Sequence, residues 1–174
     1  MSRILSRQDH SPGNDPKPMR IVAVTLPFMT VMRMEHMGIV VRDLEAATDF
    51  FVDLGLELQA NTRVGGVWVD RINGLDGVDA EITMLATPDG DGVVELAKYH
   101  SPAGPEGDPE APANTPGFRH LLFRVDDLRD TLSRLQEKHG SELVGEVEQY
   151  EDLYLLCYLR GPEGIIIELA EKLS

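Results

Sequence analysis

The sequence predicts an α+β fold in which one structural module occurs twice, and three observations support this. The stretch HMGIVVRDL, residues 36–44, is matched by HLLFRVDDL, residues 120–128, with histidine, valine, aspartate and leucine at the same places. Each stretch leads into a helical pattern and then into short strand-like pieces. The halves end in similar strands, VVELAK at 93–98 and IIELAEK at 166–172. Repetition of a whole strand-helix-strands unit predicts two modules that pack together.

The first module is predicted over residues 34–99. It begins with the β-branched strand EHMGIVV, and Asp43 is a suitable N-cap for the helix LEAATDFFVDL. Gly55 follows this helix and is a suitable stop, because glycine adopts positive φ readily. Further strands are expected around residues 57–61, 66–71, 80–86 and 92–98.

The second module is predicted over residues 118–174, after a linker at residues 100–117 that holds five prolines and three glycines. It opens with the strand FRHLLFRV, and either Asp126 or Asp127 caps the helix LRDTLSRLQEKH, which Gly140 ends. The remaining strands are expected around 142–149, around 152–159 and, after the turn GPEG, in IIIELAEK at 165–172.

Residues 1–33 are predicted to form a flexible leader. A polar segment with three prolines precedes the apolar run IVAVTLPFMTVM at residues 21–32. This run is shorter than the ~20 residues that span a bilayer. No small-x-small cleavage site separates it from the first strand. We therefore expect no membrane anchor and no secretory signal, with the folded domain beginning near Met32 or Met34.

Charge and cysteine content narrow the partners and the compartment. Sixteen basic and thirty acidic residues give a formal net charge of −14, so nucleic acid is not an expected partner. The chain has one cysteine, Cys157, in the apolar stretch DLYLLCYLR, where it is expected to be a buried core residue. A single cysteine allows no internal disulfide, which fits a cytoplasmic location.

Four residues are candidate metal ligands, because they occupy matched places in the two modules: His36, Glu95, His120 and Glu168. Both glutamates lie within apolar strands, where an ionised carboxylate requires a pairing partner or a metal. If the modules are related by pseudo-symmetry, the four side chains converge near its axis. Two imidazoles and two carboxylates suit one divalent ion, and zinc, nickel, cobalt, manganese and iron are not distinguished. The other three histidines, His10, His100 and His139, are expected to be solvated.

These residues resemble the vicinal oxygen chelate superfamily, which includes glyoxalase I, methylmalonyl-CoA epimerase, extradiol dioxygenases and the bleomycin and fosfomycin resistance proteins. The resemblance covers about residues 34–172, and HMGIVVRDL, VVELAK and GPEGIIIEL carry it. It implies two βαβββ modules forming a cupped mixed sheet around a metal. The matching ligand positions are His36, Glu95, His120 and Glu168. Fold and scaffold are shared by different reactions, so the resemblance alone does not fix the activity.

Three functions remain open. The first is a metal-dependent lyase or isomerase, like glyoxalase I or methylmalonyl-CoA epimerase, in which Glu168 or Glu95 removes a proton alpha to a carbonyl. The second is a small-molecule binding or resistance protein, with or without metal. The third is an extradiol-type dioxygenase, which the fourth ligand Glu95 disfavours.

The substrate is expected to be a small molecule, and the sequence leaves its class open. Glutathione and coenzyme A conjugates are anionic and would need basic side chains, for which Arg63, Arg71, Arg119, Arg124 and Arg160 are available. Glu81 is either a second acid or base or an exposed strand residue, and Trp68 and Tyr99 line either a ligand cup or a packed surface. A homodimer is expected, with Phe118, Tyr154 and Tyr158 suited to an interface.

Overall fold

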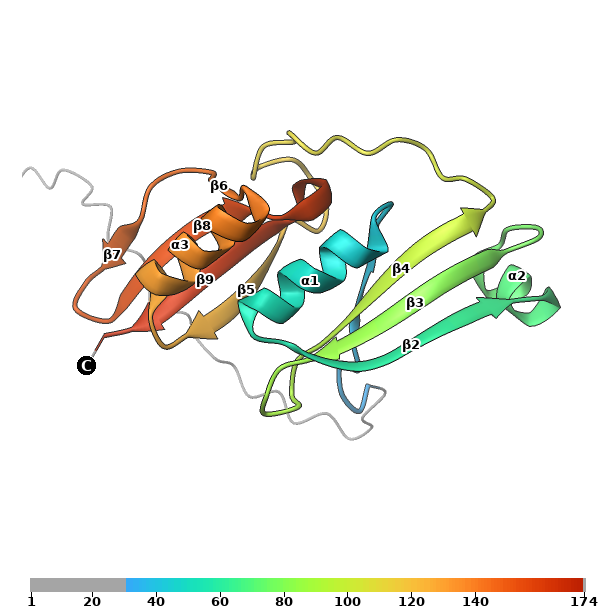
Figure 1. Cartoon of the computed structure of the whole chain (residues 1–174), viewed down its shortest axis with the longest axis horizontal. Coiled ribbons are helices and arrows are strands. Elements are labelled where there is room, and N and C mark those ends of the chain that lie inside the picture. Colours follow the sequence, from blue (N-terminus) through green and yellow to red (C-terminus); the bar gives the residue numbers. More distant parts are fainter. Residues whose placement is uncertain (1–30, 174) are drawn as a thin grey trace, which may run out of the picture. The chain divides into compact units, whose positions relative to one another are not determined.

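The computed structural model describes residues 31–173, and its fold lies within the compact unit Glu35–Ser174 (Figure 1). Most of the predicted leader, residues 1–33, lies outside the described residues. The elements follow one another as β1 (Met37–Val40), α1 (Leu44–Leu54), β2 (Glu57–Gly65), α2 (Val67–Asn73), β3 (Asp79–Ala86), β4 (Val93–Ser101), β5 (His120–Val125), α3 (Leu128–His139), β6 (Glu142–Leu143), β7 (Glu148–Tyr150), β8 (Tyr154–Arg160), the 3-10 turn η1 (Pro162–Gly164) and β9 (Ile166–Lys172).

The strands form two mixed sheets with the same topology. The first sheet has the order β1-β4-β3-β2, and the second has the order β5-β9-β8-β6, with β7 also pairing with β8. In each sheet the opening strand runs parallel to the closing strand, and the other pairs are antiparallel. The predicted α+β fold with two βαβββ modules is confirmed, with α2 added between β2 and β3.

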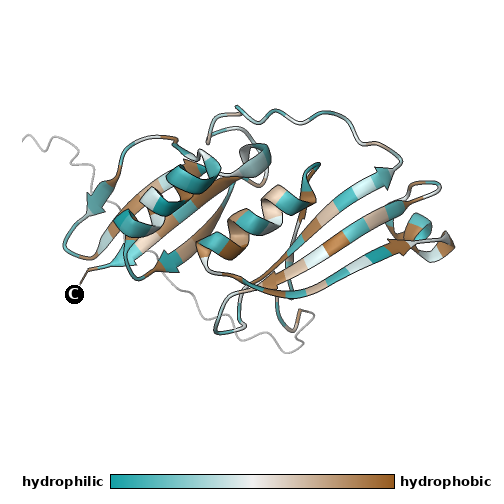
Figure 2. Cartoon of the chain, viewed as in Figure 1, coloured by the Kyte–Doolittle hydropathy of each residue, from teal (hydrophilic) through white to brown (hydrophobic). Residues whose placement is uncertain are grey.

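The two long helices begin and end where the sequence predicts. The Asp43 side chain accepts a hydrogen bond from the backbone N–H of Ala46 at the start of α1, and Asp127, rather than Asp126, does the same for Asp130 in α3. Gly55 (φ 121°) and Gly140 (φ 64°) end these helices in conformations that favour glycine. Figure 2 shows mostly hydrophilic residues on the visible side of α3, so its apolar side is turned inward.

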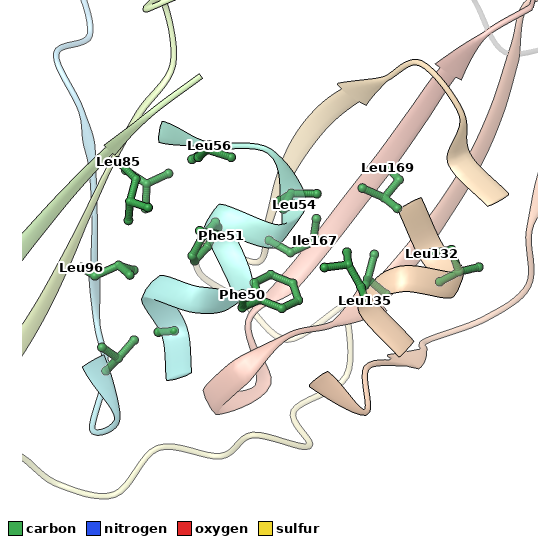
Figure 3. Packing of buried hydrophobic residues seen from close by; sticks show 14 of the residues in the cluster. Phe50, Phe51, Leu54, Leu56, Leu85, Leu96, Leu132, Leu135, Ile167 and Leu169 are labelled. Carbon is green, nitrogen blue, oxygen red and sulfur yellow. The ribbon is translucent and has the colours of Figure 1, made fainter. Parts of the chain in front are cut away.

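One hydrophobic core serves both modules. Phe50 and Phe51 of α1 are fully buried, and they belong to a cluster that takes Leu96 from the first sheet and Ile167 from the second (Figure 3). Gly161 lies against this core, since a Cβ there would stand 2.9 Å from the ring of Phe50. Cys157 is buried in the same cluster, as predicted.

Two carboxylates add polar links between the modules. Glu163, in the GPEG turn, accepts hydrogen bonds from the backbone N–H groups of Arg42 (2.8 Å) and Asp43 (3.1 Å) at the start of α1. Asp53, near the end of α1, contacts the Lys138 Nζ at 2.6 Å and the His139 Nε2 at 2.9 Å, both on α3. These links join each end of α1 to the second module.

The strand predicted at residues 66–71 is wrong, because this segment belongs to helix α2. Its β-branched and aromatic residues gave a strand-like pattern, but only Val69 of the helix is buried, on a small cluster with Val78 and Ala80. Glycines at both ends, Gly66 (φ 93°) and Gly74 (φ 66°), turn the chain into and out of the helix.

The single strand predicted at residues 142–149 is also wrong. Two short strands, β6 and β7, flank residues 144–147, of which Val144 still bonds to Tyr158 before the chain leaves β8. From the pair Leu143/Leu159 to the pair Glu148/Leu156, this side advances five residues (148 − 143) and β8 advances three (159 − 156). The two extra residues make the segment bulge away from the sheet.

Candidate functional site

The first candidate ligand pair lies where β1 and β4 run side by side. The His36 Nε2 is 3.6 Å from the Glu95 Oε2, and the two side chains are 40% and 26% exposed. Glu95 lies in register with Gly38, and a Cβ at Gly38 would meet the Glu95 Oε1 at 3.8 Å. A methyl group at position 38 would therefore lie in ordinary van der Waals contact with the carboxylate.

The second pair occupies the corresponding place between β5 and β9. The His120 Nε2 is 3.1 Å from the Glu168 Oε2, and Glu168 is the less exposed partner, at 14% against 39%. Glu168 lies in register with Leu122, which is itself exposed. The carboxylate thus has an apolar neighbour on β5, with the imidazole as its described ion-pair partner.

The two pairs share one geometry. In each sheet the glutamate is in register with the residue two positions after the histidine, Gly38 for Glu95 and Leu122 for Glu168. Because side chains two apart on a strand share a face, each histidine lies on the face of its glutamate. We call these two surfaces the ligand faces of the first and second sheets.

The structure does not gather the four candidate ligands within one chain. Among the described residues there is no group of three or more His, Cys, Asp or Glu side chains that could hold a metal. The convergence expected from pseudo-symmetry is therefore absent inside the single chain, where each module contributes one pair.

Tyr158 adds a third group to the second pair, a place that differs from the interface position that the sequence predicts for it. It lies in register with Glu168 across β8 and β9, and its ring centroid is 5.0 Å from that of His120. Burial raises the pKa of the Tyr158 hydroxyl, and the neighbouring Glu168 carboxylate raises it further. The sequence shows that Tyr158 and Arg160 lie two positions apart on one strand. It does not show the register between this strand and the next, which brings Tyr158 beside Glu168.

A family model describes residues 33–169 as belonging to the Glyoxalase/Bleomycin resistance protein/Dioxygenase superfamily. The chain belongs to this superfamily. The matched segment includes every residue of both ligand pairs and all of the second sheet except the end of β9.

Solved structures and a curated protein are similar to this chain. The crystal structure of a glyoxalase family protein from Bacillus cereus is 42% identical, with a TM-score of 0.82 over 86% of this chain and 99% of that one. The uncharacterized protein YwbC of Bacillus subtilis (strain 168) is 27% identical over 80% of this chain and 98% of its own length. TnmS3, an antibiotic binding protein from Streptomyces sp. CB03234, shares the superfamily fold at 22% identity and a TM-score of 0.55, covering 83% of this chain and 99% of that chain.

Glu81, which the sequence predicts as either an acid or base or an exposed strand residue, lies away from the ligand faces of the two sheets. Glu81 is three positions from Met84, the register partner of Glu95, so it projects from the opposite face of β3. There it accepts a hydrogen bond from Asn61 and lies 3.6 Å from His100. The expectation that His139 is solvated is wrong, since its side chain is 15% exposed and pairs with Asp53.

Three of the five candidate arginines form ion pairs or hydrogen bonds away from the ligand pairs. Arg63 pairs with Asp79 in the first sheet. Arg119 and Arg160 donate hydrogen bonds to backbone carbonyls of the segment Pro109–Ala111. Arg71 lies on helix α2, and Arg124 lies near the end of β5, where it lines a surface pocket together with Asp126 and Asp127.

The aromatic residues considered as a ligand cup behave differently from each other. Tyr99 packs on the Val69 cluster, and its hydroxyl donates a 2.7 Å hydrogen bond to Asn73. Trp68 is 62% exposed on α2.

In the part of the chain that the structure describes, no helix has both the length and the apolar character needed to cross a membrane.

Proposed function

We propose that this superfamily member is a metal-dependent lyase or isomerase that removes a proton alpha to a substrate carbonyl. One observation carries the proposal. The histidine and glutamate pairs occur in both modules, at the same positions and in the same register. Core packing and solubility do not require an imidazole and a carboxylate to be repeated in this way, and both groups are donors that a metal ion binds.

The residues present fit a divalent metal as two half-sets. Each pair offers one imidazole nitrogen and one carboxylate oxygen, the donors that zinc, nickel, cobalt, manganese and iron accept. Because a catalytic site commonly has three or more protein ligands, one pair alone is incomplete. His36 and Glu95 of one chain, with His120 and Glu168 of a second chain, would supply four.

A symmetric homodimer is therefore part of the proposal. In an isologous dimer each pair of one chain can face the other pair of its partner, which gives two equivalent sites. Exposed apolar residues on the ligand faces, Val40 at 66% and Leu122 at 54%, support burial of these surfaces by a second copy.

The chain's own groups divide the chemistry. Glu168 is the preferred base, because it is the less exposed carboxylate and lies beside the hydroxyl of Tyr158, which stays neutral. Glu95 is the corresponding carboxylate of the other pair and would bind the same ion from the partner chain. A bound divalent ion would polarise the carbonyl oxygen and so favour loss of the alpha proton.

Metal content and subunit mixing test the site. Purified protein should hold about one ion per chain, and His36→Ala or His120→Ala should each strongly lower that content, measured by elemental analysis. Mixing the two variants should restore about a quarter of the wild-type metal content. Half of the dimers then contain one chain of each variant, and one of the two sites in such a dimer has both histidines. No restoration on mixing would place each site within one chain, and full content in the double variant would refute the site.

Solvent deuterium exchange tests the reaction. Candidate hemithioacetals and acyl thioesters are incubated in D2O, without oxygen and with metal restored, and exchange at the alpha carbon is followed by NMR. Exchange should be lost in Glu168→Gln while the metal is still bound. Oxygen-dependent turnover of catechols with iron would instead support a dioxygenase.

A second candidate is a small-molecule binding protein that works without metal. The absence of a three-ligand cluster among the described residues favours it, and a binding protein for antibiotics shares the fold. Saturable binding without metal, exchange or turnover would select this function.

A further inference from the structure

A surface groove of about 360 Å³ opens directly beside the second ligand pair. Glu168 and Tyr158 line one side, and Leu156 and Cys157 continue that side along β8. The opposite wall is the bulged segment between β6 and β7, including Val144, Gly145, Glu146 and Glu148. The volume lies within the range of about 300 to 1,000 Å³ that small-molecule sites occupy.

The bulge between β6 and β7 creates this groove. The backbone N–H of Val144 still bonds to the carbonyl of Tyr158, but the chain leaves β8 until Glu148 pairs with Leu156. A regular strand would have continued the pairing from Tyr158 to Leu156 and filled the space between them with paired backbone. Because of the two extra residues, the segment bulges away from β8 and leaves a groove next to the proposed base, Glu168.

The electrostatic character of the groove is one-sided. Three of the described residues that line it are glutamates, Glu146, Glu148 and Glu168, and none is basic. The nearest arginine on the strand of Tyr158, Arg160, is held by carbonyl groups of the linker. In the metal-free protein an anionic ligand would meet three carboxylates here and no basic side chain, and Glu146 and Glu148 would still repel it if a metal ion were bound at Glu168.

We infer that this groove receives the body of the substrate, and that the substrate is an uncharged, largely apolar carbonyl compound rather than an anionic thiol conjugate. The assignment of the ligand as substrate rests on the proposed function, because Glu168 supplies the chemistry. Binding in the groove stands on the cavity, its apolar strand residues and its charge. An acyl chain or aromatic ring against Leu156 places its carbonyl end toward Glu168.

Two matched probes test the charge selectivity. 2-Hydroxyacetophenone and its analogue with a carboxylate on the ring share the same carbonyl group and ring and differ by one charge. Calorimetry with metal-free protein should show saturable binding of the neutral probe and roughly tenfold weaker binding of the carboxylate. Replacing both exposed glutamates, in Glu146→Lys/Glu148→Lys, should reverse this preference.

A filling substitution tests the location. Leu156→Trp should abolish binding of the neutral probe, whereas Leu58→Trp, on an exposed position of the other sheet, should not. If Leu156→Trp does not fold, judged by circular dichroism, the glutamate variant alone decides, because both of its positions are exposed.

The outcomes separate this inference from the proposed function. Binding of the neutral probe that responds to both variants supports the groove. If the protein as purified also holds no metal and takes up none when it is added, the proposed metalloenzyme is refuted. Metal content that depends on His120, with equal binding of both probes or with binding unaffected by Leu156→Trp, refutes the groove alone. Binding that disappears as the protein dimerises would show that a second copy fills the groove, and would overturn the inference.

Discussion

At the scale of single residues, the second ligand pair is distinguished by its phenol. Tyr158 is the register partner of Glu168, and burial together with that carboxylate raises the pKa of its hydroxyl. Ionised phenol beside ionised carboxylate is unfavourable, so the hydroxyl remains a hydrogen-bond donor throughout the neutral pH range. This property suits a group that lies next to a base and a polarised carbonyl.

The raised pKa of Tyr158 gives a direct prediction. The difference between the tyrosinate absorbance titrations of the wild type and Tyr158→Phe isolates this phenol, and its midpoint should lie above the ordinary tyrosine value. Glu168→Gln should lower the midpoint, because one of its causes is removed. Since the folded pKa is raised, this group's contribution to stability is present below the ordinary value and is lost as the pH rises through the raised one. An unchanged midpoint in Glu168→Gln would contradict the arrangement.

At the scale of elements, α1 and α3 are joined by a carboxylate as well as by apolar contacts. Asp53 accepts hydrogen bonds from Lys138 and His139, and these bonds, Lys138 first, lower the pKa of its carboxyl. Its backbone carbonyl also accepts a hydrogen bond from Arg134. Three side chains of α3 therefore converge on one residue of α1.

We expect Asp53→Asn to lower the melting temperature at neutral pH, because the charge-assisted bonds are lost. The folded pKa is lowered, so this stabilisation is present above the ordinary carboxyl pKa and disappears as the pH falls through the lowered value. The two proteins should thus converge in acid. Asp49→Asn, one turn earlier on the exposed side of α1, is the control and should melt like the wild type. A loss that persists in strong acid would point to packing instead of charge.

At the scale of the whole molecule, the shared core should make the modules unfold together. Phe50 contacts residues of both modules, and its truncation in Phe50→Ala should reduce the free energy of unfolding by about 3 to 5 kcal/mol, a large part of a typical total. Val52→Ala, on the exposed side of the same helix, should change it by less than about 0.5 kcal/mol.

The same experiment tests cooperativity. Trp68 is the only tryptophan of the chain and lies in the first module, whereas circular dichroism reports on both modules. Denaturant transitions followed by the two signals should coincide. Two separated transitions would show that each module has enough core of its own.

The sequence by itself determined the repeat, the two long helices with their aspartate caps and glycine stops, and the matched positions of His36, Glu95, His120 and Glu168. These features depend on local periodicity and on residue type, which are read along the chain. The closing strands were likewise predictable, because each is a short apolar run interrupted by a glutamate near its middle.

Only the tertiary structure decided how these parts meet. The segment at α2 has strand-like composition, yet it forms a helix of which Val69 is the buried residue. Tyr158 reaches Glu168, and residues 144–147 bulge, because of a register between strands that no single strand encodes. His139 is drawn from solvent by Asp53, 86 residues away. The two ligand pairs lie in separate sheets, and the physical reason is that strand pairing is satisfied within each module while the core joins the modules through their helices.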